Sequence, residues 1–556
     1  METRPAPNAW LRGAGLWLLV CLGVIFLYLM FMARNVDAIT DIDALDNAQI
    51  ARNLAEGKGF TSDFIKPLCL TKVTALDHHA DLIFSPLHPW FTSMVMRVVG
   101  ATKFGIAFGS LLPFLFTLLL VYLLGMRLFD QRTGILAAAL LGLNLWVVRY
   151  SVSGLEVCLL GLLVTALFMV LHRIGESEET NLAQVAVAGL LVGALALTKD
   201  VWGLILLPTA LFLWLTVDKR QRWIVLGVFV GLFVVAIIPW CLRQAHYTGN
   251  PFFSWRWYET EMETITNPGN TLYRSFRPDV ANPIAFVFAH PLEMYEKIRL
   301  GASSLYGILT YVGGAFVLPF FVVAILVVMG NSTLERMRYL LYLTYGLVFV
   351  AVCFIMPSPR MFYPFAPMIS IIAAAFFLRV FTPLLRRYGP REQARLNGLG
   401  LAAIILIQGF PLLLNITARQ EAGRSSSIGG AEKLALQVAE VTTGPIITDV
   451  PWLTSWYGHQ TSIWLPRSWD DLERMQLSIG QVQYLLLTPT VAQWEGAERT
   501  AEWIRLWSAA QAGRPVAYRG FVVYKLLGDN WILFRKAAEL PGRTGASSEV
   551  PNAPAG

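Results

Sequence analysis

Long apolar segments with almost no charge recur along most of this 556-residue chain. A helix needs about 20 such residues to cross the hydrocarbon core of a bilayer, where each segment must satisfy its own backbone hydrogen bonds. Charged residues make up only 15% of the chain, against roughly 25% in soluble domains. The sequence therefore predicts a polytopic α-helical membrane protein.

About eleven segments meet this length criterion. They are residues 13–32, 105–125, 133–148, 157–171, 183–197, 201–217, 223–242, 301–329, 339–356, 361–378 and 396–417. The first is longer than the apolar core of a signal peptide and is followed by no small-residue cleavage site, so we expect a retained helix.

Lys and Arg collect in alternate short connections, which the positive-inside rule assigns to the cytoplasm. If the N-terminus is cytoplasmic, the inner connections carry Arg127, Arg132, Arg173, Lys219, Arg220, Arg222, Arg336, Arg338, Arg386, Arg387, Arg391 and Arg395. We therefore expect a multi-pass protein of the inner membrane with its C-terminal part outside the cytoplasm. The net charge of +7 then reflects membrane topology and does not indicate nucleic acid.

The chain divides into three parts. Residues 1–417 form the predicted transmembrane body, interrupted by two long outer loops, 33–104 and 243–300, whose lengths suggest folded or functional segments. Residues 418–541 are expected to form a small extracytoplasmic α/β domain, and the Ser-, Pro- and Gly-rich tail 542–556 is expected to be disordered. In this domain a helical pattern at 431–441 precedes strand patterns at 445–450, 462–465, 482–488, 520–526 and 531–535, with a hairpin turn at 528–530.

Three carboxylates, Asp41, Asp43 and Asp46, follow the first apolar segment. Helix-forming residues run from about Asp43 until Gly57 and Gly59, which predicts a short helix along the membrane surface with the acids at its N-terminus. An Asp there can simply cap the helix. Ionisable groups beside the hydrocarbon region more often serve a function, however, so both interpretations stay open.

Several motifs in the first loop and beyond occur together and in order. The chain resembles the GT-C membrane glycosyltransferases, the superfamily that includes protein mannosyltransferases and the lipid A aminoarabinose transferase, and it is most similar to bacterial members. The resemblance lies in Asp43 to Ala51, Arg52-Asn53-Leu54, Gly57-Lys58-Gly59-Phe60, Ser85-Pro86-Leu87-His88-Pro89-Trp90, Pro359-Arg360-Met361-Phe362-Tyr363-Pro364, Thr448-Asp449-Val450-Pro451, Ser455-Trp456-Tyr457-Gly458 and Ile463-Trp464-Leu465-Pro466. The family often has a second acid and an aromatic residue where this chain has Ala44 and Asn47.

This resemblance implies transfer of a sugar, with inversion, from a polyprenyl-phosphate-linked donor to a lipid, glycan or protein acceptor on the outer face. Such chemistry needs a carboxylate that takes the acceptor proton and cations that hold the lipid phosphate. The spacing to Ala51 favours Asp43 as the base, with Asp46 or Asp41 as alternatives. A second acid of the family corresponds to Glu156, which could instead be a paired helix-end carboxylate, for example with Arg149.

Three outward cations lie beside apolar segments and are candidates for the lipid phosphate: Arg360, Lys199 and Lys66. Arg360 leads, because the planar guanidinium matches phosphate oxygens. Lys199 could instead be neutralised by its neighbour Asp200, and any of the three could reach toward lipid headgroups.

The same loop holds a polar cluster in which His78, His79 and Asp81 are weak candidates for a divalent metal site. No cofactor is identified by the sequence, and metal dependence is left open. His79, His88 and Tyr363 are candidates for the acceptor path. In the second outer loop, Trp255, Trp257 and Tyr258 could stack on sugars or belong to an interfacial aromatic belt.

Two other activities compete with single-sugar transfer. A ligase for lipid-linked polymers would use the same donor chemistry on a finished chain, and a polyprenyl-lipid transporter or flippase would also be polytopic. Transporters usually show repeated halves, which this chain lacks. A non-enzymatic scaffold predicts that the acids can be replaced without loss of function.

Overall fold

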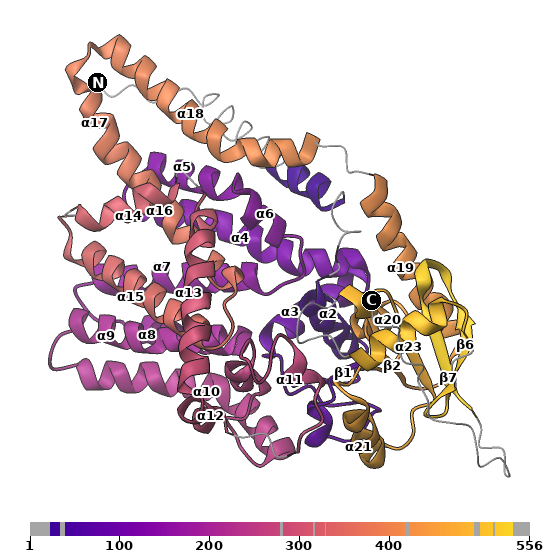
Figure 1. Cartoon of the computed structure of the whole chain (residues 1–556). Coiled ribbons are helices and arrows are strands. Elements are labelled where there is room, and N and C mark those ends of the chain that lie inside the picture. Colours follow the sequence, from indigo (N-terminus) through magenta and orange to yellow (C-terminus); the bar gives the residue numbers. More distant parts are fainter. Residues whose placement is uncertain are drawn as a thin grey trace.

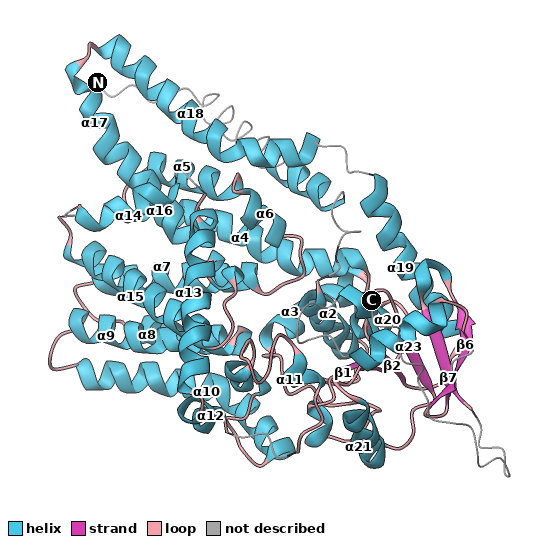
Figure 2. Cartoon of the chain, in the orientation of Figure 1, coloured by secondary structure: helices cyan, strands magenta, loops and turns pink. Residues whose placement is uncertain are grey.

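The computed structural model describes residues 23–33, 39, 41–278, 282–314, 317–327, 330–417, 422–493, 501–514 and 517–537. A large helical body fills most of the molecule, and a small sheet lies at one end of it (Figures 1 and 2). The predicted tail 542–556 and the first half of the segment 13–32 lie outside the described residues.

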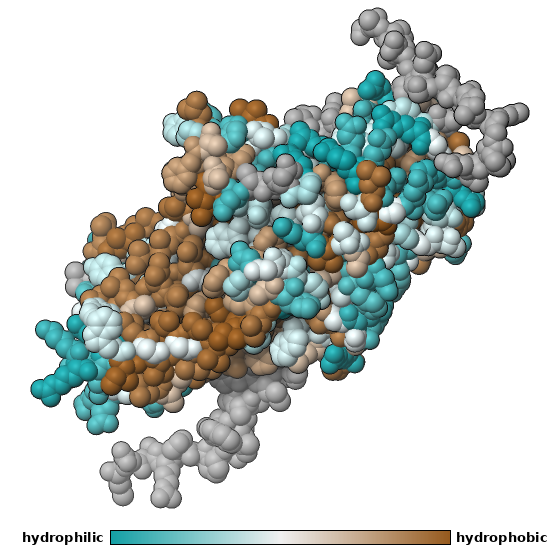
Figure 3. Space-filling view, turned by 90° about the horizontal axis from the view of Figure 1, so that it is seen from below, coloured by the Kyte–Doolittle hydropathy of each residue, from teal (hydrophilic) through white to brown (hydrophobic). Residues whose placement is uncertain are grey.

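The body is built from helices that follow the apolar segments. Their bounds are α4 Lys103–Leu128, α5 Gln131–Gly142, α6 Leu145–Tyr150, α7 Val157–Glu176, α8 Leu182–Thr198, α9 Leu206–Thr216, α10 Arg222–Thr248, α13 Pro291–Val312, α14 Val317–Val323, α15 Ser332–Phe354, α16 Ala366–Phe376, α17 Thr382–Leu384 and α18 Pro390–Thr417. Within the described ranges, six helices are long and apolar enough to span a membrane, and four shorter apolar helices accompany them. On the face shown in Figure 3, an apolar surface lies over the body between polar ends, as a multi-pass membrane protein requires.

Two predicted spans are each divided in the structure. Residues 133–148 form α5 and α6, because the Asn144 side chain accepts hydrogen bonds from the N–H groups of Trp146 and Val147 and begins a new helix. Residues 301–329 contain the end of α13 and all of α14. Between them Gly314 has φ +90°, and a Cβ there would lie 2.2 Å from Gln408. The uninterrupted apolar pattern hid both breaks.

The first outer loop contains α2 Ile42–Ala55, β1 Phe64–Ile65, the 3-10 turn η2 Cys69–Thr71 and α3 Leu87–Val99. Helix α2 begins after Asp41 and ends before Gly57, which has φ +81°, as predicted. The position of this helix along the membrane surface stays a prediction. Helix α2 packs between α3 and α20, the helix Pro451–Trp456, and residues 44–53 are buried.

The outer part is organised around a seven-stranded sheet in the order β1-β3-β2-β4-β7-β6-β5. The other strands are β2 Ile446–Thr448, β3 Ser462–Trp464, β4 Tyr484–Leu487, β5 Ala517–Tyr518, β6 Phe521–Leu526 and β7 Ile532–Lys536. Strands β1, β3, β2 and β4 run parallel, and β7, β6 and β5 continue antiparallel. All five predicted strand regions are present. Helices α19 Ala422–Val441, α21 Trp469–Ile479, α22 Thr490–Gln493 and α23 Ala501–Gln511 complete this part.

Strand β1 comes from the first outer loop, far from the rest of the sheet in sequence. Phe64 and Ile65 pair in register with Ser462 and Ile463 of β3. The second loop, with η4 Trp255–Glu261, α11 Thr271–Arg274 and α12 Pro283–Ala289, adds Trp255 to the same apolar core. Both loops and the C-terminal strands therefore form one structural unit at one end of the helical body.

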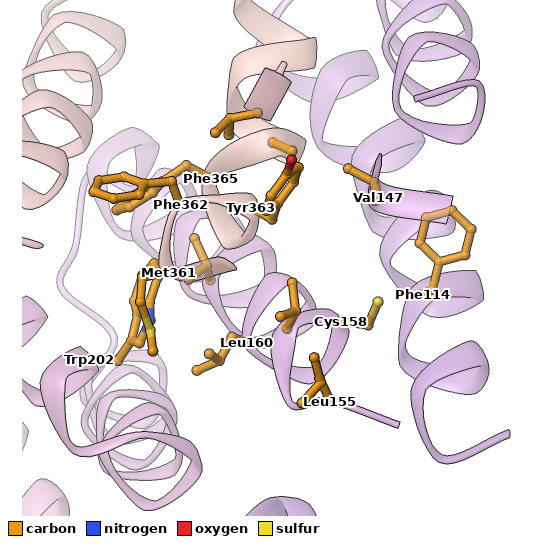
Figure 4. Packing of buried hydrophobic residues seen from close by; sticks show 14 of the residues in the cluster. Phe114, Val147, Leu155, Cys158, Leu160, Trp202, Met361, Phe362, Tyr363 and Phe365 are labelled. Carbon is orange, nitrogen blue, oxygen red and sulfur yellow. The ribbon is translucent and has the colours of Figure 1, made fainter. Parts of the chain in front are cut away.

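The segment that leads into α16 is anchored in the main core. It consists of two 3-10 turns, η6 Pro359–Met361 and η7 Tyr363–Phe365, instead of a continuous helix. Phe362 and Phe365 are fully buried beside Trp202 of the turn η3 Asp200–Ile205, and the Trp202 and Phe365 ring centroids are 4.9 Å apart (Figure 4). This packing fixes the backbone directly after Arg360.

Candidate functional site

The three aspartates of α2 have three different partners. The Asp41 carboxylate accepts the Ala44 N–H at 3.0 Å and caps the helix. Asp43 is ion-paired with Arg360. Asp46 is buried, pairs with Lys66 and accepts a 3.0 Å hydrogen bond from the Gln49 side chain. The capping interpretation therefore holds for Asp41, while Asp43 alone of the three contacts a phosphate-ligand candidate from a late transmembrane segment.

Arg360 projects from η6 toward α2. Its side chain is 15% exposed and that of Asp43 is 31% exposed, so the pair retains access from one side. Arg360 Nε is buried and donates no hydrogen bond to any described residue. One edge of the guanidinium is thus held by Asp43, and a donor group remains for another acceptor.

A second ion pair lies beside the first. Glu156 precedes α7, Lys199 follows α8, and Lys199 Nζ lies 2.8 Å from Glu156 Oε1 with both residues about 5% exposed. The alternative of a buried, paired helix-end carboxylate therefore holds for Glu156, with Lys199 as its partner and not Arg149, while Lys199 is paired with Glu156 and not with Asp200. Each of the two ion pairs therefore joins a candidate acid to a candidate phosphate ligand.

Arg256 is the functional candidate that sequence reasoning missed. Its Nε donates to the Ile83 carbonyl at 3.2 Å, its Nη1 lies 3.4 Å from Glu259 Oε1, and its guanidinium stacks on the Phe84 ring at 4.8 Å. Arg256 stands between aromatic residues in a long outer loop. A cation in that context was the signal available in the sequence, but only the fold brings it beside the two ion pairs.

The charges of this group act on one another. Burial raises the pKa of Asp43, but the nearby Arg360, Arg256 and Lys199 outweigh burial and hold that pKa well below its usual range. Burial also raises the pKa of Glu156, but Lys199 and Arg360 outweigh burial, so that pKa is lowered as well. Burial and Arg256 lower the pKa of Lys199. Two ionised carboxylates and three cationic side chains thus share one electrostatic neighbourhood.

The three cations line a cavity of about 640 Å³. Lys199, Arg256 and Arg360 contribute to its wall together with the polar residues Asp200 and Ser254. The remaining wall is mostly apolar and comes from α8, η3, α10, α12 and the end of α15, with Leu197, Leu204, Phe233, Ile237, Trp240 and Ile355 among its residues. The cavity therefore combines three cationic side chains with a mostly apolar wall.

Other sequence candidates lie outside this cavity. Lys66 is absent from its wall and is enclosed by Asp46 and the Phe64 ring, 4.0 Å from the Lys66 ammonium. Burial raises the pKa of Asp46 above its usual range, against the opposing effect of Lys66. The structure therefore gives Lys66 a partner within the first loop and leaves Lys199, Arg256 and Arg360 to face the cavity.

The metal candidates are not assembled into a site. His78 is largely exposed, His79 is buried with Nδ1 2.9 Å from the Ala75 carbonyl, and Asp81 accepts the backbone N–H groups of Ile83 and Phe84. Among the residues that the structure describes, no three His, Cys, Asp or Glu side chains form a group able to hold a metal ion. Adjacent residues on a tight turn point apart, so the proposed cluster of His78, His79 and Asp81 is wrong.

The acceptor-path candidates are buried. His88 Nε2 lies 2.9 Å from the Gly154 carbonyl, two residues before Glu156, and Tyr363 packs on Tyr150 with ring centroids 4.8 Å apart. Trp255 is 2% exposed and belongs to the apolar core that contains the sheet strands, so its ring is not accessible for either of the two interpretations, stacking on a sugar or contact with the membrane interface. Trp257 is 52% exposed and lines the cavity.

The fold is similar to that of solved membrane glycosyltransferases, which confirms the resemblance expected from the sequence. Residues 79–240 match the family model described as dolichyl-phosphate-mannose-protein mannosyltransferase. This matched region contains α3 to α9 and the first part of α10, and it includes both Glu156 and Lys199.

Two solved structures are similar over nearly the whole chain. ArnT from Cupriavidus metallidurans, bound to undecaprenyl phosphate, aligns with a TM-score of 0.57 and 13% identity over 97% of this chain and 100% of its own. The archaeal oligosaccharyltransferase AglB from Archaeoglobus fulgidus, in complex with an inhibitory peptide and a dolichol-phosphate, aligns with a TM-score of 0.51 and 12% identity over 94% and 75%. At this identity the likeness establishes the fold. Comparison with curated protein sequences gives no match.

Proposed function

We propose that this protein is a glycosyltransferase that moves a sugar from a polyprenyl-phosphate-linked donor to an acceptor on the outer face of the inner membrane, with inversion at the anomeric carbon. The observation that carries this proposal is the cavity whose mostly apolar wall also contains Lys199, Arg256 and Arg360. The two similar structures were determined with undecaprenyl phosphate and with a dolichol-phosphate, which are ligands of this chemical kind.

A polyprenyl phosphate has two parts with opposite demands. Its tail gains free energy when it leaves water for an apolar wall, and its phosphate needs cations that replace lost hydration. The apolar wall from α8 and α10 suits the tail, and Arg360 and Arg256 suit the phosphate oxygens because their planar forks donate several hydrogen bonds. The same cations stabilise the negative charge that builds on the phosphate as the sugar leaves.

Asp43 is the base in this proposal. In the reaction the bond between the anomeric carbon and the phosphate oxygen breaks, the acceptor oxygen bonds to that carbon, and the acceptor proton passes to a carboxylate. Asp43 is ionised, partly exposed and beside Arg360, so it lies next to the place where the leaving phosphate would sit. A phosphate that engages Arg360 would weaken the Asp43 ion pair and raise the pKa of the base toward a useful range.

Glu156 takes the supporting role. It is 4% exposed and bound to Lys199, so it has less access to an acceptor than Asp43 has. We infer that Glu156 holds Lys199 in the cavity wall and that it shares the electrostatic balance of the site.

Envelope glycans and lipids from cells carrying wild-type or Asp43→Asn protein provide the test, with mass spectrometry as the readout. We expect the variant to lack one sugar increment that wild-type cells contain. The size of the increment separates the proposed activity from a polymer ligase, which would move a whole chain, and from a flippase, which would leave no new bond.

The matched control is Asp77→Asn. Asp77 lies in the same loop, undergoes the same chemical change, and has a side chain that is 96% exposed. Cells with this control should keep the increment. Identical glycans in all three strains, at equal protein levels in the membrane, would contradict the proposed function.

A further inference from the structure

Asp200 lines the cavity beside the cations and links the first and second long loops. It is the first residue of η3 and follows Lys199 directly. Its carboxylate accepts a hydrogen bond from Ser85 of the first loop through one oxygen and from Ser254 of the second loop, at 2.9 Å, through the other. Ser85 and Ser254, which are 169 positions apart in the sequence, thus bind the same carboxylate of the helical body.

The link through Ser254 continues to Arg256. The Ser254 hydroxyl donates to Asp200 and accepts the Arg256 backbone N–H at 3.3 Å, so it caps η4 at its start. The hydroxyl can do both because it has one hydrogen and two lone pairs. Asp200 therefore fixes the backbone from which the Arg256 side chain begins.

The link through Ser85 reaches the other end of the same side chain. Ser85 follows Ile83 and Phe84, whose carbonyl and ring contact the Arg256 guanidinium. A hydrogen bond that holds Ser85 also limits the movement of these two neighbours. Asp200 thus constrains Arg256 from its backbone and from its guanidinium surroundings.

We propose that Asp200 is a positioning residue that holds Arg256 in the orientation needed to bind the phosphate of the lipid donor. This inference rests on the proposed function, since it assigns Arg256 to the donor phosphate. Asp200 itself contacts serine hydroxyls, so it acts through Ser85 and Ser254. Replacing Asp200 should therefore weaken binding of the donor phosphate and leave binding of the apolar tail unchanged.

Cys241 offers a direct report on the cavity. It lines the wall and is partly exposed, whereas Cys69, Cys158 and Cys353 are buried. The rate at which N-ethylmaleimide modifies Cys241 in the purified full-length protein, followed by peptide mass spectrometry, measures occupancy. Undecaprenyl phosphate and uncharged undecaprenol serve as the two probes. Wild-type protein should be protected by both, and by undecaprenyl phosphate at lower concentration.

For Asp200→Asn we expect protection by undecaprenyl phosphate to need about tenfold more lipid, the factor that corresponds to one lost hydrogen bond of a charged group, while undecaprenol protects as in wild type. Ser254→Ala and Ser85→Ala should each show a smaller loss of the same kind. Ser254→Thr keeps a hydroxyl and should restore wild-type behaviour. Ser275→Ala is the control, because the Ser275 hydroxyl donates to the Leu272 carbonyl within the same loop.

The outcomes separate the two proposals. Wild-type protein that neither lipid protects would overturn the proposed donor site and this inference with it. Wild-type protection with unchanged Asp200→Asn, Ser85→Ala and Ser254→Ala variants would overturn only the positioning role. An equal loss of Cys241 protection by both lipids in these variants would also overturn the positioning role. Such a result would indicate a general collapse of the cavity and not a specific effect on phosphate binding.

Discussion

Arg360 and Asp43 form an ion pair across 317 positions of the sequence. One residue lies in a 3-10 turn that leads into α16, and the other lies in the first turn of α2. The pair joins a late membrane segment to the first outer loop. It also places the proposed base against a proposed phosphate ligand, so the same contact has structural and chemical consequences.

Two substitutions of Arg360 separate the contribution of its positive charge to phosphate binding from that of its planar guanidinium. Arg360→Ala should weaken binding of undecaprenyl phosphate by about tenfold to a hundredfold, because a charge-assisted contact is lost. Arg360→Lys should recover only part of this affinity, since Lys keeps the charge but lacks the planar fork. Binding in detergent measures both variants. Normal affinity in Arg360→Ala would remove Arg360 from the phosphate site.

The Glu156 and Lys199 pair should behave as one unit in stability measurements. Removing one partner leaves a buried charge uncompensated, so Glu156→Leu or Lys199→Met alone should lower the free energy of unfolding by about 3–5 kcal/mol. The double variant should lose less than the sum of the two. Thermal unfolding of all four proteins gives the coupling energy. Additive losses would show that the two side chains do not interact.

Arg52, a residue of α2, should hold the C-terminal part of the chain against this helix. Its guanidinium, 2% exposed, donates to the carbonyls of Ser455 and Trp456 at 2.9 and 2.8 Å and pairs with Asp63 at 3.2 Å. Arg52→Ala leaves two buried carbonyls without these donors, which should cost about 2–4 kcal/mol and speed limited proteolysis of the C-terminal part.

Arg97→Ala is the matched control for this change. Arg97 also donates to a carbonyl of α2, that of Leu54 at 3.0 Å, but on the exposed surface. It should cost less than about 1 kcal/mol. Equal proteolysis of the Arg52 and Arg97 variants would contradict a special role for Arg52.

Asp449 should make stability depend on pH. It is fully buried at the end of β2, accepts the Thr488 N–H and hydroxyl, and has its pKa raised to about 7 by burial. The folded state then holds this proton more tightly than the unfolded state does. Asp449 therefore adds up to about 4 kcal/mol to the free energy of unfolding below about pH 4, and this contribution is lost as the pH rises to about 7.

Asp449→Asn removes the titrating group and keeps the size and hydrogen-bonding capacity of the side chain. We expect this variant to lose the Asp449 part of the decline between pH 4 and pH 7 in chemical unfolding of the purified protein. An unchanged pH profile would contradict the assignment.

Local patterns were enough for much of the fold. The helix that starts after Asp41 and stops at Gly57 followed from a cap and a glycine, and the five predicted strand regions followed from short apolar runs between turn residues. The breaks at Asn144 and Gly314 were missed, because a membrane segment stays apolar on both sides of a break. The strand β1 was missed because two residues carry too weak a pattern.

The site was harder to obtain from sequence. Asp43, Glu156, Arg360 and Lys199 were all singled out, but their pairing was not, since each pair joins segments that only the packed bundle brings together. Arg256 went unnoticed for the same reason. The histidine cluster, by contrast, was close in sequence and separate in space.

By itself, the sequence determined the class of molecule, the order of its segments and the residue types that the chemistry needs, because apolar length, caps and turn residues act over a few positions. Tertiary structure alone decided which carboxylate met which cation and which cations faced the apolar cavity. Those choices depend on long-range packing, such as the burial of α2 between α3 and α20 and the anchoring of Arg360 by Phe362 and Phe365.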